Sequence, residues 1–182
     1  MIEGTASNPL EDIVAVIQSA KARAVGVEGL DGLEAFIARA LPDASEAEVE
    51  DAARLALEII ESIPVFLARA RQEAGERGLD QVVLPLLERA ERYFLKPIDL
   101  IPEMTHGLPG LLDDAYLVIR TLQSLDGGSE PFLDWNIEAP VQFLDRVLGP
   151  SMTDRLDGIA AEALDDVSDR LDVLWDNSAH RA

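Results

Sequence analysis

Residues 93–120 read YFLKPIDLIPEMTHGLPGLLDDAYLVIR, and this stretch decides how the whole chain is interpreted. It places three prolines, a lone aspartate, a histidine and an Asp-Asp pair inside an otherwise apolar segment. Proline cannot continue a helix, because it lacks an amide hydrogen and its ring clashes with the preceding turn. The stretch therefore predicts two helices joined by a stiff, non-helical turn.

Two prolines stiffen this turn. Pro97 ends the first helix, and Pro102 holds the residue before it in an extended conformation. Residues 98–101 then lack helical partners for their backbone amides. We expect Asp99 to accept some of those amide hydrogen bonds, as aspartate commonly does in turns.

An Asp-Asp pair opens the second helix. If that helix begins near Gly110, Asp113 and Asp114 fall in its first turn, where the helix dipole favours a carboxylate by about 0.3–1 kcal/mol each. The first interpretation of the stretch is therefore architectural, a proline-stiffened hairpin pinned by carboxylates.

The order of these residues resembles a known family. Tyr93, the run from Pro97 through Asp99 to Pro102, Gly110 and the Asp113-Asp114 pair are similar to the signature of the YkvA-like domain, a widespread bacterial and archaeal family of unknown function. The resemblance spans about residues 88–122. It implies a helix-loop-helix hairpin whose role is not established, and membrane association for some members of the family.

This chain departs from that family in two respects. Glu103 stands where the family usually has Asp, and residues 104–107 replace a more apolar stretch. Charged residues also dilute the apolarity of the hairpin. Peripheral membrane attachment through the hairpin is therefore a third hypothesis, which the strong negative charge of the chain disfavours.

The loop carboxylates support a second hypothesis, a divalent-cation site. Mg²⁺, Mn²⁺ and Ca²⁺ all favour oxygen ligands, although the loop spacing matches no EF-hand. No other cofactor is expected. The ligands of such a site would be Asp99, Glu103, Asp113 and Asp114, with His106 as an additional ligand.

Glu103 and His106 also have the Glu-x-x-His spacing of di-iron carboxylate bundles. A di-iron site needs that motif twice, on helices, and His180 is the only other histidine. His106 is therefore more simply interpreted as a loop donor to a backbone carbonyl.

The composition predicts a soluble, all-α protein. Hydrophobic residues make up 48% of the 182 residues but aromatic residues only 5%, which suits helices packed through aliphatic side chains. The net charge of −20 opposes binding to nucleic acid. The chain has no cysteine, so disulfides and thiolate metal sites are excluded. With no basic signal region and no long apolar run, we expect a cytoplasmic protein without a transmembrane span.

Capping residues and apolar spacing predict the helix boundaries before the hairpin. Asn8 caps a helix with Ile13, Val14, Ile17 and Ala20 on one face, and Asp31 opens a short second helix. Ser45 and Glu48 form a capping box before a helix that reaches about Ala70, with a kink or split at Pro64. Asp80 caps the helix that leads into the hairpin.

After the hairpin we expect helices over residues 111–125, 132–137 and 141–148, and a longer final helix. Ser151, with Asp154 as its capping-box partner, would begin that final helix. Residues 126–129, Asp-Gly-Gly-Ser, are the most flexible connection and the only candidate sub-boundary in a single domain over residues 1–182. The apolar stripe of the last helix comprises Met152, Leu156, Ile159, Ala163, Val167, Leu171, Leu174 and Trp175.

No motif of nucleophilic catalysis or of a phosphate-binding loop is present. We therefore expect one all-α, bundle-like domain of about six to eight helices around a central hairpin. Its leading function is a non-enzymatic, acidic scaffold or interaction module that binds an unidentified protein or another copy of itself. The alternative is a regulatory or hydrolytic cation-binding protein.

Overall fold

The fold is entirely helical in the part of the chain that the structure describes. The computed structural model describes residues 8–24, 29–96, 107–126 and 131–165, and these ranges contain seven α-helices and no strand. The expectation of an all-α fold with six to eight helices is confirmed. The helices are α1 (Pro9–Arg23), α2 (Asp31–Ala40), α3 (Glu46–Arg77), α4 (Asp80–Leu95), α5 (Leu112–Gln123), α6 (Glu138–Leu148) and α7 (Pro150–Asp165). Two short 3₁₀ helices, η3 (Leu108–Leu111) and η4 (Ser124–Asp126), flank α5.

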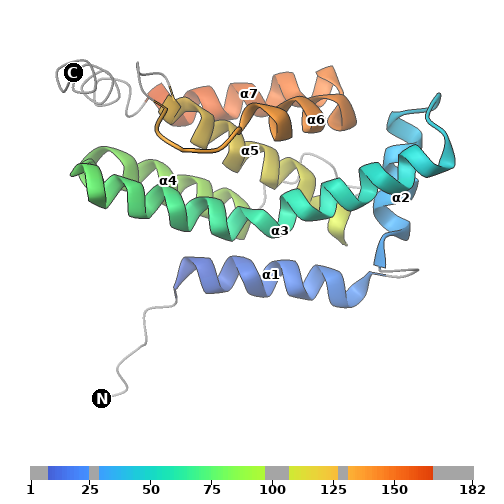
Figure 1. Cartoon of the computed structure of the whole chain (residues 1–182), viewed down its shortest axis with the longest axis horizontal. Coiled ribbons are helices and arrows are strands. Elements are labelled where there is room, and N and C mark those ends of the chain that lie inside the picture. The colour runs from blue at the N-terminus through green and yellow to red at the C-terminus, as the bar shows by residue number, and fades with distance from the viewer. Residues whose placement is uncertain (1–7, 25–28, 97–106, 127–130, 166–182) are drawn as a thin grey trace.

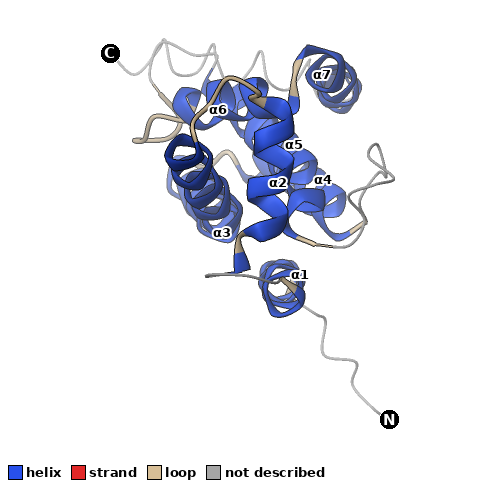
Figure 2. Ribbon diagram, turned by 90° about the vertical axis from the view of Figure 1, so that its right-hand side faces the viewer, coloured by secondary structure: helices blue, strands red, loops and turns tan. Residues whose placement is uncertain are grey.

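Helix α5 lies at the centre of the assembly. It packs against α3, α4, α6 and α7, and Figure 1 shows it between the α3–α4 pair and the α6–α7 pair. Helix α2 packs against α3 and α6 at one end. Helix α1 lies at the edge in both Figure 1 and Figure 2, where it covers α3, α4 and η3.

The central position of α5 follows from its sequence. Every residue from Leu112 to Ile119 is at most 5% exposed, including both aspartates of the Asp-Asp pair. Successive residues point to all sides of a helix, so a run of eight buried residues means that other elements cover α5 on every side. The α4–α5 hairpin is therefore the core of the fold, and α7 packs across both of its helices.

Two predicted helix starts are confirmed. The Asn8 side chain accepts a hydrogen bond from the amide of Leu10 at 3.2 Å, and Pro9 is the first helical residue. At the start of α3, the Ser45 amide donates to Glu48 Oε2 at 2.8 Å, and the Glu48 amide donates to Ser45 Oγ at 3.4 Å. These bonds satisfy amides that the first turn of a helix leaves without partners.

Helix α3 does not split at Pro64. It runs for 32 residues to Arg77, so the prediction that it ends near Ala70 is wrong. An internal proline costs a helix about 3 kcal/mol. Burial of large aliphatic side chains on both sides of the proline offsets that cost. These side chains are Ile59, Ile60, Ile63 and Leu67.

Two predictions about the first half of the chain need correction. Leu79, not Asp80, is the N-cap of α4, and Asp80 is the first helical residue. A carboxylate there is still favoured by the helix dipole. Val14 is 43% exposed, because α1 contacts its neighbours on one side only and its buried residues are Ile13, Ile17 and Ala20.

The final helix begins differently from the prediction. Helix α7 starts at Pro150, whose fixed φ suits a first helical position, so Ser151 lies inside the helix rather than at its cap. The carbonyl of Gly149 accepts hydrogen bonds from the amides of Met152 and Thr153, at 3.1 Å each. The predicted Ser151–Asp154 capping box is therefore wrong.

The predicted stripe of α7 is partly confirmed. Leu156 and Ala163 are buried and Met152 and Ile159 are half-buried, while Thr153 and Ala160 complete the buried face. The stripe residues Val167, Leu171, Leu174 and Trp175 lie outside the described residues.

Residues 131–137 are not helical, contrary to the prediction for residues 132–137. Asp126 Oδ1 accepts hydrogen bonds from the amides of Phe132 and Leu133, at 2.7 and 3.3 Å. Arg77 Nη2 donates to the carbonyls of Pro131 and Phe132, at 3.1 and 3.2 Å. Because side chains satisfy these backbone groups, the segment needs no helical hydrogen bonds. Residues 127–130 lie outside the described residues, so the single domain stays a prediction.

Candidate functional site

The structure describes four of the predicted signature residues. Tyr93 is half-buried near the end of α4, Gly110 lies in η3, and Asp113 and Asp114 lie in the first turn of α5, as predicted. The remaining signature and candidate ligand residues lie outside the described residues. They are Pro97, Asp99, Pro102, Glu103 and His106.

Asp113 and Asp114 are part of the core. Their residues are 5% and 1% exposed, and Asp113 Oδ1 accepts a hydrogen bond from the amide of Asp114 at 3.1 Å. Among the described residues, no three His, Asp or Glu side chains are grouped so as to hold a metal ion. Because the other candidate ligands lie outside those residues, the cation site stays a prediction.

A polar cluster joins the middle of α5 to α6 and α7. The hydroxyl of Tyr116 lies 3.0 Å from Asp145 Oδ1 and 2.9 Å from Asp157 Oδ1. Arg120, one turn further along α5, donates through Nε to Asp157 Oδ1 at 2.8 Å and through Nη1 to Gln123 Oε1 at 2.5 Å. Three helices therefore meet at one buried phenol.

The cluster changes the acidity of its members. Burial, followed by the hydrogen bonds to Asp157 and Asp145, raises the pKa of the Tyr116 hydroxyl far above its usual range. Burial acts to lower the pKa of Arg120, but its hydrogen bond and charge interaction with Asp157 outweigh burial and raise it. Tyr116 therefore keeps its proton, and Arg120 its positive charge, throughout the physiological pH range.

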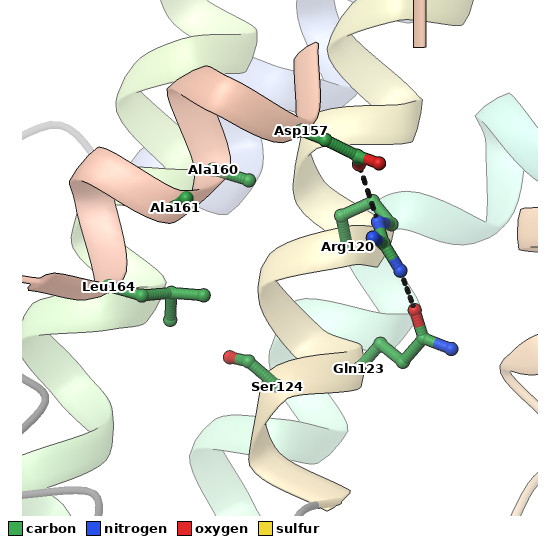
Figure 3. A pocket seen from close by; sticks show the side chains of 7 residues that line it. All are labelled: Arg120, Gln123, Ser124, Asp157, Ala160, Ala161 and Leu164. Carbon is green, nitrogen blue, oxygen red and sulfur yellow. Dashed lines mark hydrogen bonds and ion pairs between the residues drawn. The ribbon is translucent and has the colours of Figure 1, made fainter. Parts of the chain in front are cut away.

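A surface hollow lies beside this cluster, between α5 and α7. Its volume is about 290 Å³. Figure 3 shows Ala160, Ala161 and Leu164 of α7 on one side, and Ser124 and the Arg120–Gln123 pair on the other. The α7 side of the hollow is therefore largely apolar, and Arg120 and Asp157, which form an ion pair, also line it.

The sequence interpretation missed this site although two of its residues belong to the quoted stretch. Tyr116 and Arg120 are four residues apart, so they lie on one face of a helix. Arg120 is also the only Lys or Arg between Lys96 and Arg146. An isolated basic residue among so many acidic ones is a signal that could have identified the cluster.

Comparison with known proteins identifies the hairpin alone. The model of a family described as "protein of unknown function (DUF1232)" matches residues 92–119. The resemblance to the YkvA-like domain over residues 88–122 is consistent with this family. No curated protein and no solved structure matches the chain. Among the described residues, the matched segment covers the last turn of α4, η3 and the buried part of α5.

Proposed function

We propose that the protein is a non-enzymatic, acidic helical interaction module that binds a basic, amphipathic segment of a partner protein. The proposal rests on the hollow between α5 and α7. Partner recognition commonly depends on one or two large side chains that fill such a pocket, surrounded by polar groups that exclude water.

The size of the hollow supports a side chain better than a metabolite. Pockets for small molecules usually measure about 300–1,000 Å³ and enclose most of the ligand. At about 290 Å³ and open to solvent, this hollow is slightly smaller than that range and encloses a ligand less completely. It has room for an apolar side chain that packs on Leu164 and Ala160.

The charge of the surrounding surface selects a basic partner. Helix α7 carries four carboxylates and one arginine, and the chain as a whole has a net charge of −20. Such a surface attracts a cationic segment and increases its association rate at low salt. The carboxylates of α7 are Asp154, Asp157, Glu162 and Asp165, and its arginine is Arg155.

The polar groups of the hollow favour binding rather than catalysis. Ser124 Oγ donates to the carbonyl of Thr121 at 2.6 Å, and Asp157 is engaged by Arg120 and Tyr116. A nucleophile needs an adjacent base within hydrogen-bond reach. Among the residues that line the hollow, the only hydroxyl donates instead to a backbone carbonyl.

The proposal can be tested by selecting peptides on the wild-type protein and measuring their binding to a variant in which a tryptophan side chain fills the hollow. A random peptide library is selected on the wild-type protein, and the enriched peptides are measured against Ala161→Trp and Ala35→Trp. Ala161 lines the hollow on α7, whereas Ala35 is exposed on α2. We expect peptides with an apolar residue beside Lys or Arg, at least ten-fold weaker on Ala161→Trp and unchanged on Ala35→Trp. Peptides without basic residues, or equal binding to both variants, would refute the proposal.

Two other functions make different demands on the protein. Self-association would make the protein dimeric in sedimentation experiments, and that dimer would be sensitive to Ala161→Trp. Membrane attachment would make the protein co-sediment with liposomes. None of the helices within the described ranges has the length and apolarity to cross a bilayer. We place the module in the cytoplasm as part of the proposal.

A further inference from the structure

The hollow is elongated along α7. Four of its seven described lining residues belong to that helix, and they are Asp157, Ala160, Ala161 and Leu164. Residues three or four positions apart lie on one face of a helix, and a rise of about 1.5 Å per residue places Asp157 and Leu164 about 10 Å apart along the axis. The other three residues come from the end of α5 and the start of η4. The hollow is therefore a groove between helices, about two turns long.

The two ends of the groove differ in polarity. Figure 3 shows Asp157 and Arg120 toward one end, and Leu164 and Ser124 toward the other. Ala161 lies between Asp157 and Leu164 on α7, about one turn from each. An occupant that matches both ends needs a polar group and an apolar group, separated by about one helical turn.

The carboxylate of Asp157 is held in place but not fully used. Its Oδ1 atom accepts the hydroxyl of Tyr116 at 2.9 Å and Nε of Arg120 at 2.8 Å. Its second oxygen, Oδ2, forms no hydrogen bond or ion pair with any described residue, and the side chain is 39% exposed. Because two donors already fix the side chain, a further partner at Oδ2 would cost little conformational entropy.

Arg120 does not balance the negative charge around Asp157. Asp145 Oδ1 lies 3.0 Å from the same Tyr116 hydroxyl, and Arg120 interacts electrostatically with both aspartates. Two carboxylates and one guanidinium therefore share this junction, and at neutral pH they leave one negative charge in excess. A cationic group from an occupant would balance that charge at the polar end of the groove.

A helix suits the groove better than an extended chain. Side chains four positions apart lie on one face of a helix, about 6 Å apart along its axis, which matches the separation of Asp157 and Ala161 on α7. An extended chain would reach the same distance in two positions, but its backbone amides and carbonyls would need partners. The two helices that form the groove bond those groups within themselves. A helix brings its own backbone hydrogen bonds, as amphipathic helices do when they bind in grooves.

We infer that the partner segment binds as a helix laid along the α5–α7 groove, with an apolar side chain beside Ala161 and Leu164 and a Lys or Arg four positions away that pairs with Asp157. This inference rests on the proposed function and adds the conformation of the partner and the residue that selects its positive charge.

Peptides with a movable lysine test the inference on the wild-type protein. Each is an Ala- and Gln-based helical peptide of about sixteen residues with one leucine and one lysine, and the lysine stands two or four positions before or after the leucine. Fluorescence anisotropy measures the dissociation constants. We expect the four-residue separation, in one of the two directions, to bind about three- to ten-fold more tightly than both two-residue separations. If a two-residue separation binds as tightly, the inference is wrong.

Asp157→Asn tests which carboxylate pairs with the lysine. On this variant, replacing the peptide lysine by glutamine should weaken binding by less than about two-fold, against about three- to ten-fold on the wild type. Because each comparison is made within one protein, a general loss of affinity caused by the substitution cancels.

Asp154→Asn is the matched control, since Asp154 is exposed on the same helix and its replacement removes the same charge. On this variant the lysine should keep its full advantage. If both variants reduced that advantage equally, long-range attraction alone would explain the preference for a basic partner, and the role given to Asp157 would be wrong.

Ala161→Trp separates the failure of this inference from the failure of the proposed function. We expect the peptides to lose binding on this variant, because the new side chain fills the apolar end of the groove. Binding that depends on Ala161 but shows no coupling between the lysine and Asp157 would overturn the inference and leave the proposed function intact. Binding that Ala161→Trp leaves unchanged would overturn both.

Discussion

Glu91 of α4 is buried beside Arg71 of α3, whose Nη2 donates to Glu91 Oε1 at 2.5 Å. The glutamate side chain is 3% exposed and the arginine side chain 38% exposed. This ion pair links α3, the longest helix of the described structure, to α4, whose last turn begins the family-matched segment. A buried carboxylate depends on its partner, because removal of the partner leaves an uncompensated charge away from water.

Arg71→Met should therefore lower the free energy of unfolding by about 2–3 kcal/mol, somewhat less than for a fully buried pair because solvent partly reaches the arginine. Urea unfolding measures the change. Arg69→Met is the matched control on the same helix, since its ion pair with Asp134 is 3.6 Å long and exposed. We expect it to change stability by less than about 0.5 kcal/mol. If both variants changed the free energy of unfolding by the same amount, the buried Arg71–Glu91 pair would contribute no more to stability than an exposed ion pair.

Two glycines should respond to alanine in opposite directions. Gly78 ends α3 with φ 68°, a left-handed conformation that a Cβ atom makes unfavourable, so Gly78→Ala should destabilise the protein by about 1 kcal/mol. Gly158 lies inside α7, and a Cβ atom there would meet nothing within 4 Å. Gly158→Ala should stabilise by about 0.5–1 kcal/mol. Thermal and urea unfolding of both variants measure these changes, and destabilisation by Gly158→Ala would contradict the described helix.

The capping box at the start of α3 should make stability depend on pH. The hydrogen bonds from Ser45 lower the pKa of Glu48 below its ordinary value of 4.5. A lowered pKa means that this contribution is present above pH 4.5 and is lost as the pH falls through the pKa of the folded protein. Ser45→Ala should lower the melting temperature at neutral pH, and its difference from wild type should narrow below about pH 4.5.

Ser62→Ala is the control for that measurement. Ser62 Oγ donates to the carbonyl of Glu58 within the same helix, with no carboxylate side chain involved. Its effect on the melting temperature should not change between pH 3 and pH 7. A Ser45→Ala difference that stays constant over that range would rule out the role given to Glu48.

If Asp113 and Asp114 only stabilise the first turn of α5 and bind no cation, divalent cations should leave the melting temperature of the metal-free protein unchanged. A cation at a hundred times its dissociation constant would add about 2.7 kcal/mol, a shift of several degrees. Thermal unfolding with and without Mg²⁺, Mn²⁺ and Ca²⁺, repeated on Asp113→Asn and Asp99→Asn, measures this. A rise that both substitutions abolish would establish the cation site in place of the architectural role.

Local signals account for the predictions that are confirmed. Asn8 with Pro9, and Ser45 with Glu48, act within one helical turn, and the sequence alone places them correctly. Predictions failed where distant contacts compete with local preference. Pro64 favours a helix end, but buried aliphatic side chains keep α3 continuous. A helix was expected over residues 132–137, but Arg77 and Asp126 bind backbone groups of this segment.

By itself, the sequence determined the helical class, several helix starts, the acidic character and the family-like hairpin, because capping, charge and apolar periodicity act within a few residues. Only the tertiary structure decided which residues form the candidate site. Tyr116, Asp145 and Asp157 come from three helices, and Tyr116 and Asp157 are separated by 41 positions. Side chains so far apart in sequence come into contact only when the helices pack around α5, so no local sequence pattern predicts that contact.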